Sequence, residues 1–152
     1  MAHLLASVFE FHDRSRFHVV GFSLRRNDGS EWRHKIGRTC DEFYDVPERI
    51  STTELADFIY SKNIHILFNL NGWTTGERTD VFVLRPAPIQ VSYMGFCGSM
   101  GADYIDYLVT DEISSPPEWV DRIYSEKAIY MPHSYFVNDY FQSSQYVFKP
   151  LA

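Results

Sequence analysis

Residues 51–72 read STTELADFIYSKNIHILFNLNG, and this stretch specifies a helix followed by a strand. Ser51 and Glu54 have the spacing of a capping box, in which the Ser51 hydroxyl accepts from the backbone of Glu54 and the Glu54 carboxylate reaches back to the first residue. Behind the cap, apolar residues recur on one helical face: Leu55, Phe58 and Ile59. This period predicts a helix over residues 52–62.

The strand that follows is predicted over Ile64–Leu70, because the run is apolar and β-branched and Asn71-Gly72 is a turn pair. We expect it to be a central strand of the sheet, with the helix packed on one face. The side chains expected to be mostly buried are Leu55, Phe58, Ile59, Ile66 and Phe68.

The same alternation continues in both directions. Further helices are predicted at 3–12, 31–39 and 77–84 and after Pro116-Pro117, and further strands at 18–24, 42–46, 89–94, 104–110 and 127–131. Strands that alternate with helices favour right-handed βαβ units, so the fold class is α/β with a mainly parallel, Rossmann-like sheet. Residues 1–134 are predicted to form this domain. Residues 135–152 lack clear periodicity and are interpreted as an interrupted tail.

Composition narrows the class of protein. The 152 residues are 45% hydrophobic and 16% aromatic, enough to bury a core, and their net charge is −6. An acidic chain is a poor partner for nucleic acid or for an anionic membrane, so neither is expected. Cys40 and Cys97 form no metal-ligand spacing and no disulfide framework, which fits a reducing compartment.

Polar side chains follow the predicted strand at 64–70. Asn69, Asn71, Gly72, Trp73 and Thr74 combine amides, a hydroxyl and an indole, which together suit a polyhydroxylated substrate. Ligands of open parallel sheets bind beyond the carboxyl ends of the strands, where this loop is expected. The alternative is that Asn71-Gly72 is only a turn and that Trp73 only caps the core.

A glycine-rich loop follows the next predicted strand. Gly95, Gly98 and Gly101 permit close backbone approach, and free amides there could cradle a polar or phosphate group. The loop lacks the spacing and the lysine of a nucleotide-binding P-loop, so a structural turn is the competing interpretation. Asp103, Asp106 and Asp111 alternate across a strand and have no His or Cys neighbour, which argues against a metal site.

The sequence also resembles that of a known protein family. The blocks that carry it run from His65 to His133 in this order: His65–Thr74, Leu84-Arg85-Pro86-Ala87-Pro88-Ile89-Gln90, Gly95–Ser99, Asp106-Tyr107, Thr110-Asp111, Tyr124–Lys127 and Met131-Pro132-His133. Their order and spacing resemble the catalytic region of the protein O-linked N-acetylglucosamine transferases. The resemblance implies the first half of a GT-B glycosyltransferase, with the remainder absent.

The resemblance also implies chemistry. The family transfers N-acetylglucosamine from UDP-GlcNAc to Ser or Thr hydroxyls of nuclear and cytoplasmic proteins, with inversion and without a metal or other cofactor. It places Asn69, Asn71, Trp73 and Thr74 at the catalytic cleft. The residues that it implies for substrate binding are His3, Gly72, Gly95, Gly98, Ser99 and His133. Cys97 and Trp73 depart from the family pattern, which usually has proline and tyrosine or histidine there.

Because most UDP-binding residues of the family belong to its second half, the chain alone is expected to be inactive. The resemblance further implies that Met1 is internal and that His-Pro is encoded just upstream. Two alternatives remain open: a non-catalytic α/β interaction fragment from a decayed gene copy, and an independent nucleotide-binding domain.

Overall fold

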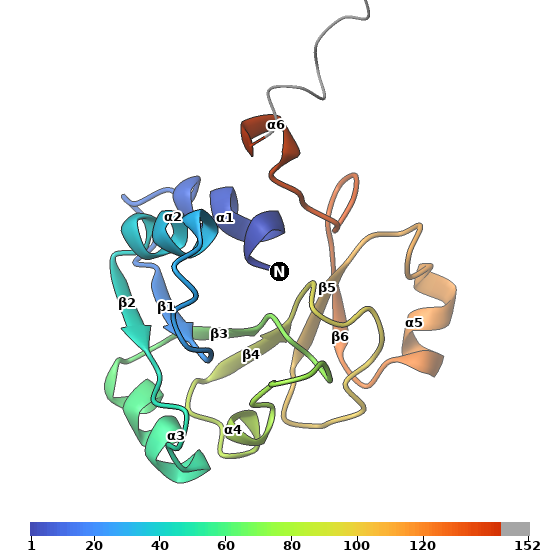
Figure 1. Ribbon diagram of the computed structural model, residues 1–152. Coiled ribbons are helices and arrows are strands. Elements are labelled where there is room, and N and C mark those ends of the chain that lie inside the picture. Colours follow the sequence, from blue (N-terminus) through green and yellow to red (C-terminus); the bar gives the residue numbers. More distant parts are fainter. Residues whose placement is uncertain (144–152) are drawn as a thin grey trace, which may run out of the picture. The chain divides into compact units, whose positions relative to one another are not determined.

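The computed structural model describes residues 1–143, and these form two compact units. Unit 1 contains Met1–Glu48 together with the described residues from Val137 onward, and unit 2 contains Arg49–Phe136. Strands and helices alternate along the chain except between β4 and β5, and every strand pair is parallel, so the predicted α/β class is confirmed (Figure 1). None of the helices within residues 1–143 has the length and apolar character needed to span a bilayer. The predicted division into residues 1–134 and 135–152 stays a prediction.

Unit 1 is built on one βαβ crossover. Its elements are α1 (Ala2–Glu10), β1 (Val20–Ser23), α2 (Glu31–Thr39), β2 (Glu42–Asp45) and α6 (Tyr140–Ser143). The Ser30 hydroxyl accepts from the Arg33 backbone and so begins α2, which leads from β1 to the parallel strand β2. α1 packs on α2 and buries Leu5, while Ile36 is the buried residue of α2.

A buried ion pair connects the two ends of unit 1. Asp139 is 1% exposed, and its carboxylate lies 3.3 Å from the Lys35 ammonium on α2. The same ammonium donates to the Ser7 hydroxyl on α1 at 2.6 Å. Residues of α1, α2 and the segment before α6 therefore converge on one lysine.

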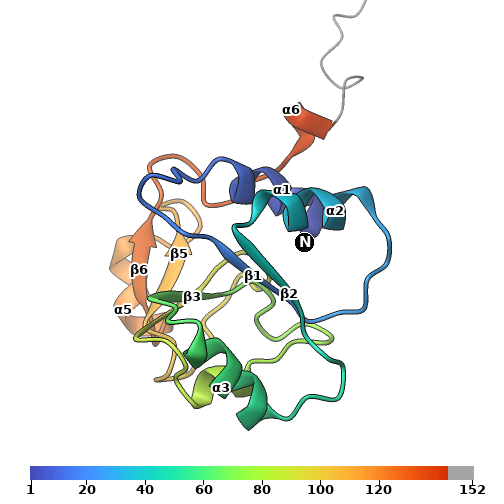
Figure 2. The same cartoon turned by 90° about the vertical axis from the view of Figure 1, so that its left-hand side faces the viewer.

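Unit 2 contains a sheet of four parallel strands in the order β3-β4-β5-β6. Its elements are α3 (Thr52–Ser61), β3 (Ile66–Asn69), α4 (Asp80–Val83), β4 (Ile89–Ser92), β5 (Tyr107–Thr110), α5 (Pro117–Ile123) and β6 (Lys127–Tyr130). Each of them, like the first four elements of unit 1, falls within or close to its predicted range. α6 was not predicted, and residues 144–152 of the expected tail lie outside the described residues. Figure 2 shows the sheet from the side, with β5 and β6 next to α5.

The predicted helix within residues 51–72 is confirmed. Ser51 and Glu54 form both halves of the capping box. Leu55 and Ile59 are 1% and 5% exposed, and the Thr52 hydroxyl bonds to the Asp80 carboxylate where α3 packs beside α4. Phe58 is only half-buried. The apolar face of the helix is therefore buried at Leu55 and Ile59 as expected, whereas Phe58 is partly exposed to solvent.

Two expectations for the following strand were wrong. β3 is the terminal strand of the four-stranded sheet rather than a central one, although it is parallel as predicted. Ile66 and Phe68 are 44% and 46% exposed, whereas Leu67 and Asn69 are buried. Side chains of a strand alternate between the two faces, and here only the face of Leu67 and Asn69 is fully covered. The sequence pointed to the opposite face, because His65 and Asn69 make the Leu67 side of the strand the more polar one.

The block Leu84–Gln90, which contains Arg85 and two prolines, has a structural role. Arg85, with a positive φ of 46°, forms hydrogen bonds of 2.9 and 3.0 Å to the two Asp106 carboxylate oxygens before β5. Asp106 also accepts from the Gln90 backbone at 2.8 Å. The buried Gln90 amide donates to the carbonyls of Phe82 and Tyr104. This network connects the entries of β4 and β5, at the opposite end of the sheet from the strand ends that carry the predicted site.

Candidate functional site

The loops that follow β3 and β4 touch each other through glycines. A Cβ atom added to Gly95 would lie 2.1 Å from the Leu70 carbonyl oxygen, and one added to Gly72 would lie 2.1 Å from the Cβ of Phe96. Gly72 also has a φ of +53°, a conformation that other residues rarely adopt. The two predicted substrate loops therefore form one continuous surface, which we call the strand-end loops (residues 69–79 and 93–102).

Asn69 is the last residue of β3 and begins the first loop, and it is 5% exposed. Its side-chain oxygen accepts from the backbone N–H groups of Asn71 at 3.0 Å and Gly72 at 2.9 Å. Its amide nitrogen donates to the Thr79 hydroxyl at 3.3 Å, and that hydroxyl donates to the Gly72 carbonyl. Since both ends of the amide are engaged, Asn69 fixes the shape of the loop.

Trp73 lies at the surface, with 49% of its area exposed. Its only polar hydrogen, on Nε1, is donated to the Met100 carbonyl at 3.2 Å. This bond orients the ring and joins the two loops. An indole has no other donor or acceptor, so Trp73 can offer a ligand only its aromatic face.

Asn71 and Thr74 close the turn between them. The Thr74 hydroxyl donates to the Asn71 carbonyl at 2.7 Å, and the Thr74 backbone N–H donates to the same oxygen at 3.3 Å. Thr74 is exposed and the Asn71 side chain is half-buried. Of the four predicted catalytic residues, these two present polar atoms nearest to solvent.

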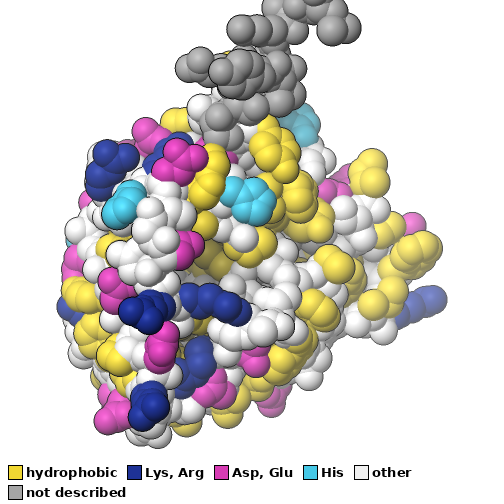
Figure 3. Space-filling view, viewed as in Figure 1, with side chains coloured by type: hydrophobic (Ala, Val, Ile, Leu, Met, Phe, Trp, Pro, Cys, Tyr) yellow, Lys and Arg dark blue, Asp and Glu magenta, His cyan; other side chains and the backbone are white. Residues whose placement is uncertain are grey.

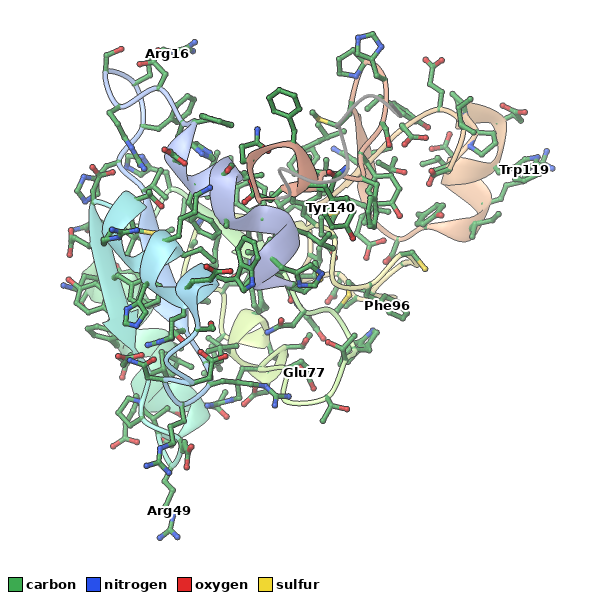
Figure 4. The ribbon with its side chains drawn as sticks, turned by 45° about the horizontal axis from the view of Figure 1, so that its top comes forward. Arg16, Arg49, Glu77, Phe96, Trp119 and Tyr140 are labelled. Atoms are coloured by element: carbon green, nitrogen blue, oxygen red, sulfur yellow. The ribbon has the colours of Figure 1, made fainter. Side chains whose placement is uncertain are left out.

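The second loop begins with a strained turn at Met94, a buried residue with a φ of 68°. The Gly95 N–H donates to the Tyr93 carbonyl across it at 2.9 Å. Such a three-residue turn is rare and carries strain. Further along, the N–H groups of Cys97 and Gly98 have no hydrogen-bond acceptor among residues 1–143. Figure 4 shows Phe96 projecting from this loop.

Ser99 is held in the protein rather than presented to solvent. Its hydroxyl donates to the Glu126 carboxylate at 2.8 Å and accepts from the Gly101 N–H at 3.0 Å. Glu126 is buried and also accepts from the Met100 N–H at 2.6 Å. Glu126 was not singled out from the sequence, although a carboxylate beside Ser125, just before a predicted strand, was a signal for such a role.

His133 lies on the exposed segment after β6. Asp111, at the end of β5, anchors this segment, because its carboxylate accepts from the Tyr135 N–H at 2.9 Å and from the Ser114 N–H at 2.7 Å. The Tyr93 hydroxyl donates to the Tyr135 carbonyl at 2.9 Å. Hydrogen bonds from the Tyr135 and Ser114 amides lower the pKa of the Asp111 carboxyl below its ordinary value of 3.8.

The remaining predicted substrate residue, His3, lies on the exposed face of α1 in unit 1. The acidic residues weighed as metal ligands have other partners: Asp106 binds Arg85, and Asp111 binds backbone amides. Among residues 1–143, no group of three His, Cys, Asp or Glu side chains has an arrangement that could hold a metal ion. The strand-end loops thus offer an aromatic face, two free amides and small polar groups.

The chain is similar in sequence to known proteins of one family. Residues 1–150 match the family model described as glycosyl transferase family 41. The chain belongs to this family. It is 49% identical, over 99% of its length, to a protein of Arabidopsis thaliana named probable UDP-N-acetylglucosamine–peptide N-acetylglucosaminyltransferase SEC. It is 40% identical, over 93% of its length, to the UDP-N-acetylglucosamine–peptide N-acetylglucosaminyltransferase of Caenorhabditis elegans.

A solved structure shares the fold of this family 41 chain. The O-GlcNAc transferase mutant of Thermobaculum terrenum superposes with a TM-score of 0.80 at 29% identity, over 87% of this chain. The chain spans 15% of the Arabidopsis relative, 12% of the Caenorhabditis relative and 25% of the solved chain. The resemblance to the first part of the O-GlcNAc transferase catalytic region, in an α/β Rossmann-like fold, is therefore confirmed.

Proposed function

We propose that this family 41 chain forms the first half of the catalytic region of a GT-B glycosyltransferase, which transfers N-acetylglucosamine from UDP-GlcNAc to Ser or Thr hydroxyls of acceptor proteins. The observation that carries the proposal is the family match over residues 1–150, together with the names of its relatives. The position of the strand-end loops supports it, since ligands of parallel sheets bind beyond the carboxyl ends of the strands.

The strand-end loops suit positioning better than proton transfer. The free N–H groups of Cys97 and Gly98 are donors for a polar or anionic part of the donor substrate, and the Trp73 ring is a stacking face for a sugar. Asn69 carries no charge and its amide is engaged in the loop, so it does not act as a strong base. Asn71, Thr74 and His133 remain the candidates for contact with the reacting groups.

The proposed reaction needs neither metal nor other cofactor. An acceptor hydroxyl attacks the anomeric carbon while UDP departs, which inverts the centre, and catalysis consists mainly of alignment and stabilisation of the departing diphosphate. We also propose that the protein acts in the nucleus and the cytoplasm. The two free cysteines fit these compartments, because thiols stay reduced there.

The chain alone is proposed to be inactive, because the groups that stabilise the diphosphate belong to the second Rossmann half. The test compares the 152-residue chain with the full-length protein that carries it, using radiolabelled UDP-GlcNAc and a Ser-rich acceptor protein. We expect label transfer by the full-length protein only. Absence of transfer by the full-length protein under conditions in which it is folded would favour the non-catalytic interaction fragment. Tight UDP binding by the chain alone would favour the independent nucleotide-binding domain.

A further inference from the structure

The strand β6 leaves one edge of the unit 2 sheet open. The N–H groups of Lys127 and Met131 donate to the carbonyls of Asp106 and Thr110, and β6 is the terminal strand beside β5. Successive backbone groups of a strand point to opposite sides, so those of Ala128 and Tyr130 point away from β5. The parallel register of β5 and β6 therefore leaves the backbone groups of Ala128 and Tyr130 outside this strand pairing, and no hydrogen bond outside the strand pairs is recorded for them within residues 1–143.

A groove runs along this open edge. It has a volume of about 400 Å³ and lies between α5 and β6. The strand side is formed by Lys127, Ala128 and Tyr130, and the helix side includes Val120 and Asp121. The groove therefore borders Ala128 and Tyr130, the same residues whose backbone groups point away from β5.

The surroundings of the groove are acidic. Burial raises the pKa of the Tyr130 phenol, and the nearby carboxylates of Glu112, Asp121 and Glu118 raise it further. Of these three carboxylates, that of Asp121 also lines the groove. The positive charges nearest in sequence are Arg122 and Lys127. On the right of Figure 3, where α5 lies in Figure 1, hydrophobic side chains lie beside carboxylates and a lysine or arginine, and Trp119 points outward from α5 in Figure 4.

We propose that the open edge of β6 binds an extended segment of another protein, rich in lysine or arginine, as a fifth strand beside the four of the sheet. Main-chain hydrogen bonds to Ala128 and Tyr130 provide the pairing, and the acidic side chains select a basic partner. A second copy of the chain is disfavoured because each copy carries a net charge of −6. This binding is independent of the proposed transferase reaction.

The test measures binding of a fluorescein-labelled peptide of alternating lysine and valine to the 152-residue chain by anisotropy, with a glutamate–valine peptide as control. Ala128→Pro removes the outward N–H but no bond to β5, which edge strands tolerate, and it should weaken binding at least about tenfold. Ala128→Val keeps that donor and should bind normally. Asp121→Lys should weaken binding, whereas Asp57→Lys, the same charge change on exposed α3, should not.

Hydrogen exchange gives a second measurement that does not depend on how the variants fold. The lysine–valine peptide should protect the amides of Ala128 and Tyr130 in the unmodified chain, and high salt should reverse the protection. Equal affinity for the acidic peptide, or unchanged exchange at these two amides, would overturn the proposal. A dimer that disappears in Ala128→Pro would assign the edge to a second copy instead.

Discussion

Gly95 lies against the backbone of Leu70, so that a Cβ atom on residue 95 would be 2.1 Å from the Leu70 carbonyl oxygen. No rotamer relieves this contact, because the backbone fixes the position of a Cβ atom and the Leu70 oxygen belongs to the main chain. The approach fixes the distance between the two strand-end loops, and this distance determines whether Asn71 and the free amides of Cys97 and Gly98 face one ligand.

Replacing Gly95 by alanine should therefore destabilise the chain by about 1–3 kcal/mol, the usual cost of forcing extra atoms into a packed site. Urea unfolding followed by circular dichroism measures the change. Gly98→Ala is the matched control, since its Cβ would meet only the movable Phe96 ring, at 3.2 Å. Equal losses from both substitutions would show that the loops are not held at Gly95.

The buried amide of Asn69 leads to a second prediction. Asn69→Asp keeps the oxygen that accepts from Asn71 and Gly72, and the Thr79 hydroxyl can turn to donate to the second oxygen. Asn69→Leu leaves both N–H groups without an acceptor, which should cost about 1–3 kcal/mol or more. The unfolding midpoints should thus fall in the order Asn69, Asp, Leu. A leucine variant as stable as the parent would show that the Asn69 side chain does not fix the shape of the loop.

In the full-length protein, Asn71→Ala or Thr74→Ala should reduce sugar transfer by more than about tenfold, because small misplacements of reacting groups are costly. His12→Ala, an exposed change in unit 1, should have little effect. Steady-state rates with UDP-GlcNAc as the varied substrate provide the measurement. Small and equal effects from all three changes would show that the loop is only a turn and does not position the reacting groups.

Substitutions at neighbouring residues of β3 should lower the stability of the chain by different amounts, because their side chains lie on opposite faces of the strand. Leu67 is 8% exposed and Ile66 is 44% exposed. Leu67→Ala should cost about 2–5 kcal/mol, and Ile66→Ala roughly half as much, because less apolar area returns to water. Denaturant titration of the two variants in parallel tests the difference, and the reverse order would place the core on the other face of the strand.

Acid should weaken the attachment of the segment after β6. Since the folded pKa of Asp111 lies below its ordinary value of 3.8, the stability contributed by its carboxylate is present above that value and is lost as the pH falls below it. Asp111→Asn should therefore be less stable than the parent near neutrality, and the gap should narrow below pH 3.8. Glu112→Gln, an exposed neighbour, should show no such dependence. A constant gap across this range would rule out the linkage.

The local elements could be predicted because their signals lie close together in the chain. The capping box at Ser51 and Glu54 and the turn after Asn69 are decided by neighbours within a few residues. The buried face of β3 could not be predicted, because the side of Ile66 and Phe68 is the more apolar one and the opposite side carries His65 and Asn69. The rest of the fold nevertheless covers Leu67 and leaves Ile66 44% exposed.

The sequence predicted which two loops follow the strands β3 and β4, but not how their side chains are engaged. Both loops were found from their residues, and the structure brings them together through Gly72 and Gly95. The engagement of the Asn69, Trp73 and Ser99 side chains with the protein itself was not visible, because their partners Thr79, Met100 and Glu126 come from other turns of the chain. Contacts across such separations depend on tertiary structure.

The ion pair between Lys35 and Asp139 has a consequence for the order in which the molecule forms. The two residues are separated by 104 positions, and all of unit 2 lies between them. During synthesis on the ribosome, unit 2 can close as soon as Phe136 has emerged, whereas Lys35 must wait for Asp139. Closing so long a loop is slow, and a longer loop costs more entropy. Unit 1 should therefore mature after unit 2, and chaperones should encounter α1 and α2 while their shared lysine still lacks its buried carboxylate.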